Sequence, residues 1–277
     1  MVCMQSALQT CMQSDLSYEL LVNAICRDSR LALLNDFIFN YFPHRMRPTK
    51  LESLQLLRQK GLPVATVLDV GVHQQTPELI RVYPDVRHIL VEPAIEFHDS
   101  IRVNYAEIDH VLVPKACGEF EGAAFLNIYD ITGFGGITHT TITDQPSSPH
   151  YRQIDITTLN SLILMFAPKG DILLKVDVDG VELNILKGAG ACLQKCSCVV
   201  VEAALSIDNN LFFDRVQYIR EQGFELWDIV DFCYYKDCLS QVDAVFVRHD
   251  IKANLLQLNP WHDGQVFDSG KWITLFQ

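Results

Sequence analysis

The sequence lacks the features of several large protein classes. No stretch approaches about 18 consecutive apolar residues, so we expect no membrane-spanning helix. The first 15 residues lack a basic segment followed by an apolar run, which argues against a secretory signal. Positive charge is scarce, because 22 Lys and Arg stand against 34 Asp and Glu and the formal net charge is −12. A nucleic-acid partner needs a basic face, so we expect none and predict a small-molecule substrate.

Paired cysteines are also missing. The chain has nine cysteines, an odd number, and no Cys-x-x-Cys pair, although Cys192, Cys196 and Cys198 are close together. A structural zinc site needs four ligands, so we predict no metal centre here. Together with the absent export signal, this pattern predicts reduced thiols in a cytoplasmic protein. We expect eight of them, all but Cys117, to be small buried hydrophobes, including Cys233 and Cys238.

The chain of 277 residues is 49% hydrophobic and 20% charged, which is typical of a globular protein. Leucines at three- and four-residue spacing predict helices in an N-terminal extension, residues 1–60. Over residues 61–250, short runs rich in Val, Ile and Leu alternate with helical stretches. That alternation predicts an α/β domain with a mostly parallel seven-stranded sheet and helices on both faces. The tail, 251–277, is rich in aromatic residues and is expected to pack on the domain.

The seven expected strands are 66–70, 88–92, 111–116, 172–177, 199–202, 225–230 and 243–247. Between the third and fourth lies an insertion. Residues 123–129 and 152–156 look like two more strands, separated by the Gly-, Thr- and Ser-rich segment 132–148. We predict a hairpin with a long surface loop, the kind of loop that carries function.

The first expected strand ends in a turn that suits ligand binding. Asp69-Val70-Gly71 is followed by four turn residues and then by Thr76-Pro77-Glu78. Thr is a good N-cap, Pro suits the first helical position, and an early Glu suits the positive end of the helix dipole. The junction therefore offers a carboxylate, backbone N–H groups and, at Gly71, room for close approach.

A second acid ends the next strand. Glu92 comes 23 positions after Asp69, where an acid suits hydrogen bonds to two ribose hydroxyls. NAD(P) would require the pattern G-x-G-x-x-G, but only Gly71 is present and Gln74 and Gln75 are bulky. We therefore expect a nucleoside ligand without phosphates, and S-adenosylmethionine is such a ligand.

The sharpest motif is LLKVDVDGVELNILKGA, residues 173–189. It resembles the signature K-(I/V)-D-V-(E/D)-G-x-E-x-x-(I/V)-L-x-G-A of FkbM-type methyltransferases, which are S-adenosylmethionine-dependent enzymes of the Rossmann-like class I. The similarity spans about residues 51–248. Its other parts are 69–71, 91–93, 154–159, 223–224 and 241–243.

The resemblance implies S-adenosylmethionine as the cofactor and methylation of a hydroxyl group on a secondary metabolite or sugar. It also places Ala116-Cys117 beside the adenine and a glycine-rich lid near 133–136. The expected cofactor-binding residues are Asp69, Gly71, Val72, His73, Thr76, Glu92, Pro93, Ala116, Cys117 and Asp177. The candidate general bases are Asp177, His73 and His139. No motif selects the acceptor, and we allow for a homodimer.

Three neighbouring acids in the motif are open to different interpretations. Asp179 and Glu182 are three residues apart where strand becomes helix, which favours a capping box. Asp177 has no capping duty and lies at a strand end, so we expect it to face the cofactor or acceptor. A Mg²⁺ site formed by all three acids is the less favoured alternative.

The chain departs from the family at Gln75, where the first loop normally has a second glycine. A position that requires a positive φ angle or a bare backbone would bind the cofactor poorly with Gln. The alternative function is therefore an inactive, methyltransferase-like binding or assembly module. An NAD-dependent dehydrogenase is a third and weaker alternative.

Overall fold

The computed structural model describes residues 49–130, 137, 139–178, 180–205 and 211–255. Several predictions fall on residues outside these ranges. They concern most of the N-terminal extension, the lid glycines, Asp179, the side chain of His139 and the aromatic tail. The predicted domain boundaries, the cytoplasmic location and the homodimer also stay predictions.

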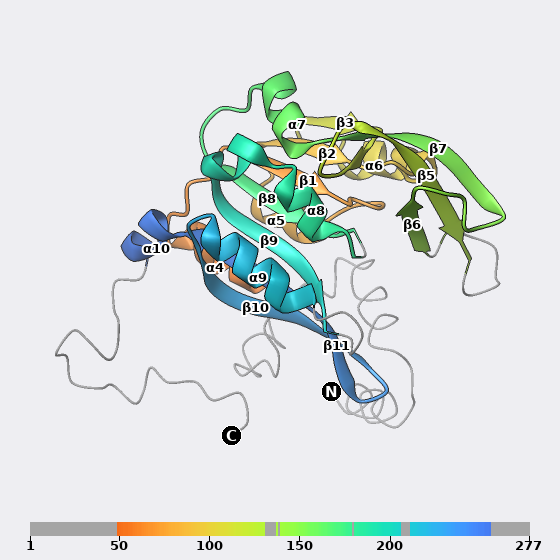
Figure 1. Cartoon of the computed structure of the whole chain (residues 1–277). Coiled ribbons are helices and arrows are strands. Elements are labelled where there is room, and N and C mark those ends of the chain that lie inside the picture. Colours follow the sequence, from red (N-terminus) through yellow and green to blue (C-terminus); the bar gives the residue numbers. More distant parts are fainter. Residues whose placement is uncertain (1–48, 131–136, 138, 179, 206–210, 256–277) are drawn as a thin grey trace, which may run out of the picture. The chain divides into compact units, whose positions relative to one another are not determined.

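A seven-stranded sheet forms the centre of the described fold (Figure 1), as predicted. Its order is β10-β11-β9-β8-β1-β2-β3. Neighbouring strands are parallel from β3 to β9, whereas β11 is antiparallel to both β9 and β10. The strands are β1 (Thr66–Val70), β2 (Arg87–Val91), β3 (His110–Val113), β8 (Ile172–Val176), β9 (Cys196–Ala204), β10 (Phe224–Tyr235) and β11 (Cys238–Arg248).

Both faces of this sheet are covered because its central strands are apolar on both sides. Side chains alternate along a strand, so Val67 and Leu173 face one core while Leu68 and Leu174 face the other. The first core is closed by α4 (Lys50–Gln59), α5 (Pro77–Val82) and α10 (His249–Leu255). The second is closed by α7 (Leu159–Phe166), α8 (Glu182–Lys187) and α9 (Leu211–Glu221).

The two strands predicted in the insertion pair antiparallel, as β5 and β7, but they belong to a second sheet that is larger than the predicted hairpin. Its four strands have the order β4-β7-β5-β6. They are β4 (Ala116–Cys117), β5 (Gly122–Tyr129), β6 (His139–Thr143) and β7 (His150–Thr157). We expected 132–148 to be a loop, but its Thr-rich part forms β6, since β-branched residues fit a strand that pairs with β5. The third strand also ends earlier than predicted, at Val113, and Ala116 joins the second sheet.

Short helices connect these sheets. The chain after β2 forms η1 (Ile95–Phe97) and α6 (His98–Asn104), and η2 (Gly190–Lys195) links α8 to β9. Ile101 and Tyr105 pack on Leu126 and Ile154 of the second sheet, which ties it to β2 through Leu90. None of the described helices is long and apolar enough to cross a membrane.

The cysteine prediction is partly wrong. All cysteines described by the structure are free thiols, and Cys117, Cys192, Cys196 and Cys198 are buried. Cys233 and Cys238 are exposed, because they lie near the tip of the β10–β11 hairpin. That hairpin extends past the residues of β11 that pair with β9, so it has no core to enter.

Candidate functional site

A pocket of about 260 Å³ opens at the carboxyl ends of β1, β2 and β8. The strand order reverses between β1 and β8, and crevices at such a switch point are the usual ligand sites of open α/β sheets. Nine of the ten predicted cofactor residues line the pocket: Gly71, Val72, His73, Thr76, Glu92, Pro93, Ala116, Cys117 and Asp177. Asp69, the tenth, lies fully buried behind it. Thr140 and Ile142 of β6 add a wall from the second sheet.

Gly71 places the first loop against the end of β8. It has a φ of +82°, and a Cβ there would lie 1.8 Å from the backbone oxygen of Asp177. Its N–H donates to the Val91 oxygen at 3.1 Å. Only glycine fits this close approach of β1, β2 and β8, so the loop depends on it.

The loop accommodates Gln75 without requiring glycine. The positive φ in this turn is carried by His73, at 55°, whereas Gln75 is not among the residues with positive φ. Gln75 is exposed and its side chain lines the pocket mouth. Thr76 occupies the predicted N-cap position of α5, but its side chain makes no cap hydrogen bond; its N–H donates to Tyr105 Oη at 3.1 Å.

Glu92 lies between two backbone donors. Its Oε2 accepts the N–H of His73 at 2.8 Å, and its Oε1 accepts the N–H of Ala94 at 2.8 Å. Burial raises the pKa of Glu92 to about 7, against the effect of these two donors. The imidazole of His73 packs against Phe97, with ring centroids 3.9 Å apart. Two backbone donors thus fix the Glu92 side chain at the place where it lines the pocket.

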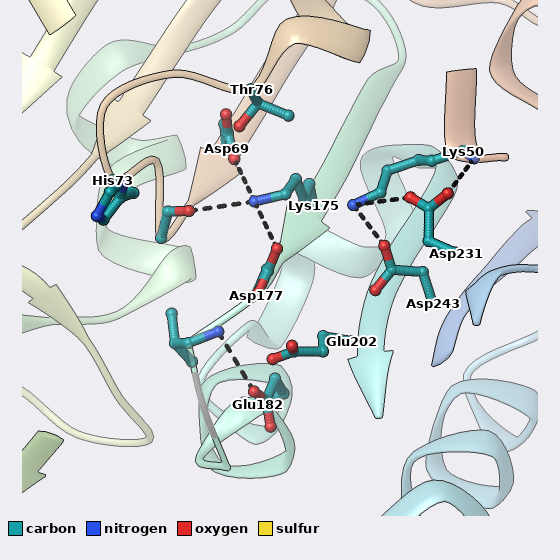
Figure 2. A network of polar contacts seen from close by, with 12 residues as sticks. Lys50, Asp69, His73, Thr76, Lys175, Asp177, Glu182, Glu202, Asp231 and Asp243 are labelled. Carbon is teal, nitrogen blue, oxygen red and sulfur yellow. Dashed lines mark hydrogen bonds and ion pairs between the residues drawn. The ribbon is translucent and has the colours of Figure 1, made fainter. Parts of the chain in front are cut away.

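Lys175 is held between two aspartates (Figure 2). Its Nζ lies 3.2 Å from Asp69 Oδ1, 3.2 Å from Asp177 Oδ2 and 3.1 Å from the Gly71 oxygen. Asp69 and Lys175 are cross-strand partners in the β1–β8 register, which explains the contact. Burial opposes the charge of Lys175, but Asp177 and Asp69 outweigh it and raise its pKa. Burial likewise opposes the charge of Asp177, and Lys175 and Lys50 outweigh it and lower its pKa.

A second lysine, Lys50, lines the pocket from the first turn of α4. Its ammonium pairs with Asp243 of β11 and lies 3.7 Å from Asp231 Oδ2 of β10. Asp231 Oδ1 also accepts the backbone N–H of Lys50 at 2.9 Å. Asp231 has a φ of 51° beside a register shift in the β10–β11 pairing, and such bulges re-aim side chains. The pKa of Lys50 is raised by Asp243, although burial opposes its charge.

The predicted capping box is wrong for Glu182. The residue before α8 is Val181, and it makes no side-chain cap. Glu182 Oε1 instead accepts N–H groups from Val178 at 3.3 Å and Gly180 at 2.9 Å, and Oε2 pairs with Arg215 of α9. Glu182 thus fixes the turn after β8, and its pairing depends on a tertiary contact that local spacing does not reveal.

The other predicted residues are distributed as follows. Ala116 and Cys117 form β4 at the end of the pocket near β3, and burial raises the pKa of the Cys117 thiol. The backbone of His139 pairs with Tyr129 in the second sheet. Among the residues that the structure describes, no three His, Cys, Asp or Glu side chains form a group suited to a metal ion. Lys50 and Asp231 belong to no motif in the sequence, and neither they nor Asp243 were predicted as site residues. Lys175 was not predicted either, although it lies two residues before Asp177, and side chains two apart on a strand share a face.

The sheet order and the pocket define a Rossmann-like methyltransferase fold. The model of the methyltransferase FkbM domain matches residues 67–226, more than half of the chain. The chain therefore belongs to the FkbM methyltransferase family, and its cofactor is S-adenosylmethionine. No curated protein matches the sequence.

Solved structures with similar folds include several methyltransferases at low sequence identity. A precorrin-6y C5,15-methyltransferase from Geobacter metallireducens is 13% identical, with 71% of this chain and 85% of that one covered and a TM-score of 0.39. The fibrillarin pre-rRNA processing protein from Methanococcus jannaschii is 14% identical over 74% and 77% of the chains, with a TM-score of 0.40. Aeropyrum pernix fibrillarin with bound S-adenosyl-L-methionine is 9% identical over 70% and 76%, with a TM-score of 0.38. Sequence identities and TM-scores this low do not indicate which methyl acceptor this protein uses.

The lining of the pocket fits the chemistry of this cofactor. Glu92, Ala116 and Cys117 line the pocket; a carboxylate there would suit a vicinal diol such as ribose, and the two small residues would leave room for a flat base. Asp177 also lines the pocket, where its negative charge would suit the cationic methionine portion. Gly71 keeps the intervening loop bare.

Proposed function

We propose that this protein is an O-methyltransferase that acts on a hydroxyl group of a small molecule or sugar. When bound, S-adenosylmethionine supplies a methyl group already activated by its sulfonium. Glu92 would hold the ribose, and Ala116 and Cys117 would flank the adenine. Asp69 is buried behind the pocket lining, so it would act on the methionine amino group indirectly. It pairs with Lys175, and Lys175 in turn pairs with Asp177, which lines the pocket. What remains for the protein is to align the acceptor oxygen and to remove its proton.

Asp177 carries this proposal. Its side chain is about one-third exposed, faces the pocket, and is kept ionised by Lys175 and Lys50. A carboxylate in that place accepts a hydrogen bond from the acceptor hydroxyl and so directs an oxygen lone pair toward the methyl carbon. Asp177 would take the hydroxyl proton as the oxygen receives the methyl group that the cofactor supplies, and the electron pair of the C–S bond would remain with the cofactor's sulfur. A carboxylate of lowered pKa suffices, because an oxygen that bears both the methyl group and the proton is strongly acidic.

The test is methyl transfer from labelled S-adenosylmethionine to a panel of methyl glycosides, polyols and phenols, with single-stranded RNA as a further arm. Transfer to a hydroxyl compound that falls at least about 100-fold in Asp177→Asn supports the proposal. Asp99→Asn, an exposed acid of α6, is the matched control and keeps full activity. The variants His73→Ala and His139→Ala test the other two candidate bases.

Three outcomes would overturn parts of this proposal. Transfer to RNA alone would exclude the small hydroxyl acceptor. Full activity of Asp177→Asn would exclude its role as the base. Absence of S-adenosylhomocysteine binding in calorimetry would favour the inactive binding module.

A further inference from the structure

The charged groups of the pocket form a row across one face of the sheet. Asp69 of β1 is paired in register with Lys175 of β8, and Glu202 of β9 is paired with Asp243 of β11. Asp177 continues this row after β8 ends, and Lys50 of α4 lies over its far end (Figure 2). Carboxylates outnumber ammonium groups along the row. An anionic group of a ligand would therefore be repelled along most of this row, and it needs a cation that still has an N–H donor without an acceptor.

Position along the sheet order separates the two ends of the pocket. Glu92 follows β2 and Ala116 follows β3, on one side of the β1–β8 switch point, and we call this side the nucleoside end. Lys50 contacts aspartates of β10 and β11 on the other side, which we call the Lys50 end. With Glu92 at the ribose, a cofactor that crosses β1 toward β8 places its amino-acid portion at the Lys50 end. That portion carries an α-ammonium and an α-carboxylate.

Among the described residues that line the pocket, three lysines are candidates for the carboxylate. Lys175 has three oxygens within 3.2 Å, which equals its number of N–H donors, so it is saturated. Lys115 lies between β3 and β4 at the nucleoside end, where it pairs with Asp155 at 3.5 Å. Lys50 has one close partner, Asp243, and a longer contact with Asp231, which leaves a donor for a ligand.

We infer that Lys50 binds the α-carboxylate of the cofactor's methionine portion, and that Asp231 and Asp243 position its ammonium. This inference rests on the proposed function. It concerns residues outside the matched family region, 67–226, because Lys50 precedes that region and both aspartates follow it. Asp231 fixes the backbone of Lys50 through its N–H, and Asp243 fixes the ammonium, so the lysine is held in place before a ligand arrives.

The experiment compares two ligands by calorimetry with the full chain. One is S-adenosylhomocysteine; the other is 5′-deoxy-5′-(3-aminopropylthio)adenosine, the same molecule without its α-carboxyl group. We expect the unchanged protein to bind the second ligand about 10- to 100-fold more weakly, since one charge-assisted contact is lost. In Lys50→Met, we expect the affinity for S-adenosylhomocysteine to fall by a similar factor. The affinity for the shorter ligand should change less than about threefold.

Two further variants make the comparison specific. Lys115→Met removes a positive charge from the other end of the pocket, so it should change the affinities of both ligands equally. Lys50→Arg keeps the charge and should retain most of the preference for the carboxylate. If Lys50→Met does not fold, the two ligands on the unchanged protein and on Lys50→Arg still test the inference.

The outcomes separate this inference from the proposed function. If the unchanged protein binds neither ligand, the proposed function fails. If it binds both ligands equally, the function stands and the carboxylate site is wrong. If it prefers the carboxylate but Lys50→Met keeps that preference, other groups bind the carboxylate, for example the N–H groups after Gly71, and the assignment to Lys50 is wrong.

Discussion

The two ends of the pocket are built in different ways. At the nucleoside end, Glu92 accepts hydrogen bonds from His73 and Ala94, which are 19 and 2 residues away in the sequence. At the Lys50 end, the contact between Lys50 and Asp231 joins residues 181 positions apart. The nucleoside end therefore comes from short motifs on consecutive strands, whereas the Lys50 end exists only when α4, β10 and β11 have packed. Lys175 lies between the two ends, where it pairs with Asp69 and Asp177.

The largest expected effect comes from removing the buried lysine between the two ends. Lys175→Met leaves Asp69 fully buried without its cation, and breaking a buried pair in this way costs about 3–5 kcal/mol of stability. Urea unfolding measures the loss. The double variant Asp69→Asn with Lys175→Met should recover most of it, because no unpaired charge remains.

Lys169→Met, an exposed lysine just before β8, is the control and should change stability by less than about 0.5 kcal/mol. A loss below about 1 kcal/mol in Lys175→Met would mean that this buried ion pair contributes little to stability. The two ends would then be independent of this buried pair.

The nucleoside end has its own pH dependence through Glu92. Its pKa is about 7 in the folded protein, against 4.5 for an ordinary glutamate, so the folded state binds the proton more tightly than the unfolded state. Stability from this group is therefore present at low pH and is lost as the pH rises toward 7. Between about pH 5.5 and 7.5, the unchanged protein should lose about 2 kcal/mol relative to Glu92→Gln, as measured by urea unfolding at each pH.

Ligand binding should reverse this dependence. Ribose hydroxyls donate hydrogen bonds to a carboxylate, which favours the ionised form of Glu92. The affinity for S-adenosylhomocysteine should therefore rise with pH up to about 7 in the unchanged protein and stay flat in Glu92→Gln. Parallel pH profiles of the two proteins would exclude Glu92 as the ribose ligand.

The contrast between local and long-range contacts also explains which parts of the fold and of the pocket the sequence predicts. The strands of the main sheet were predictable because short continuous runs of Val, Ile and Leu between helical stretches are typical of a sheet covered on both faces. Nine of ten predicted cofactor residues line the pocket because strand ends in a parallel sheet meet at one edge. Asp231 was not predictable, since its position depends on a bulge and a φ of 51° in an aspartate. Glu182 was misassigned because its partner, Arg215, lies 33 residues further along the chain.

The smallest expected effect concerns Gln75, which stands where the family usually has glycine. Since Gln75 has no positive φ and its side chain is exposed at the pocket mouth, Gln75→Gly should change the affinity for S-adenosylhomocysteine less than about threefold. Its cost in stability should be about 0.5–1 kcal/mol, because glycine gains backbone freedom in the unfolded chain. Gln74→Gly is the matched control, an exposed neighbour that does not line the pocket. A gain in affinity of tenfold or more in Gln75→Gly alone would show that the glutamine side chain occupies space the nucleoside needs, and the nucleoside end would then be partly closed in the unliganded protein.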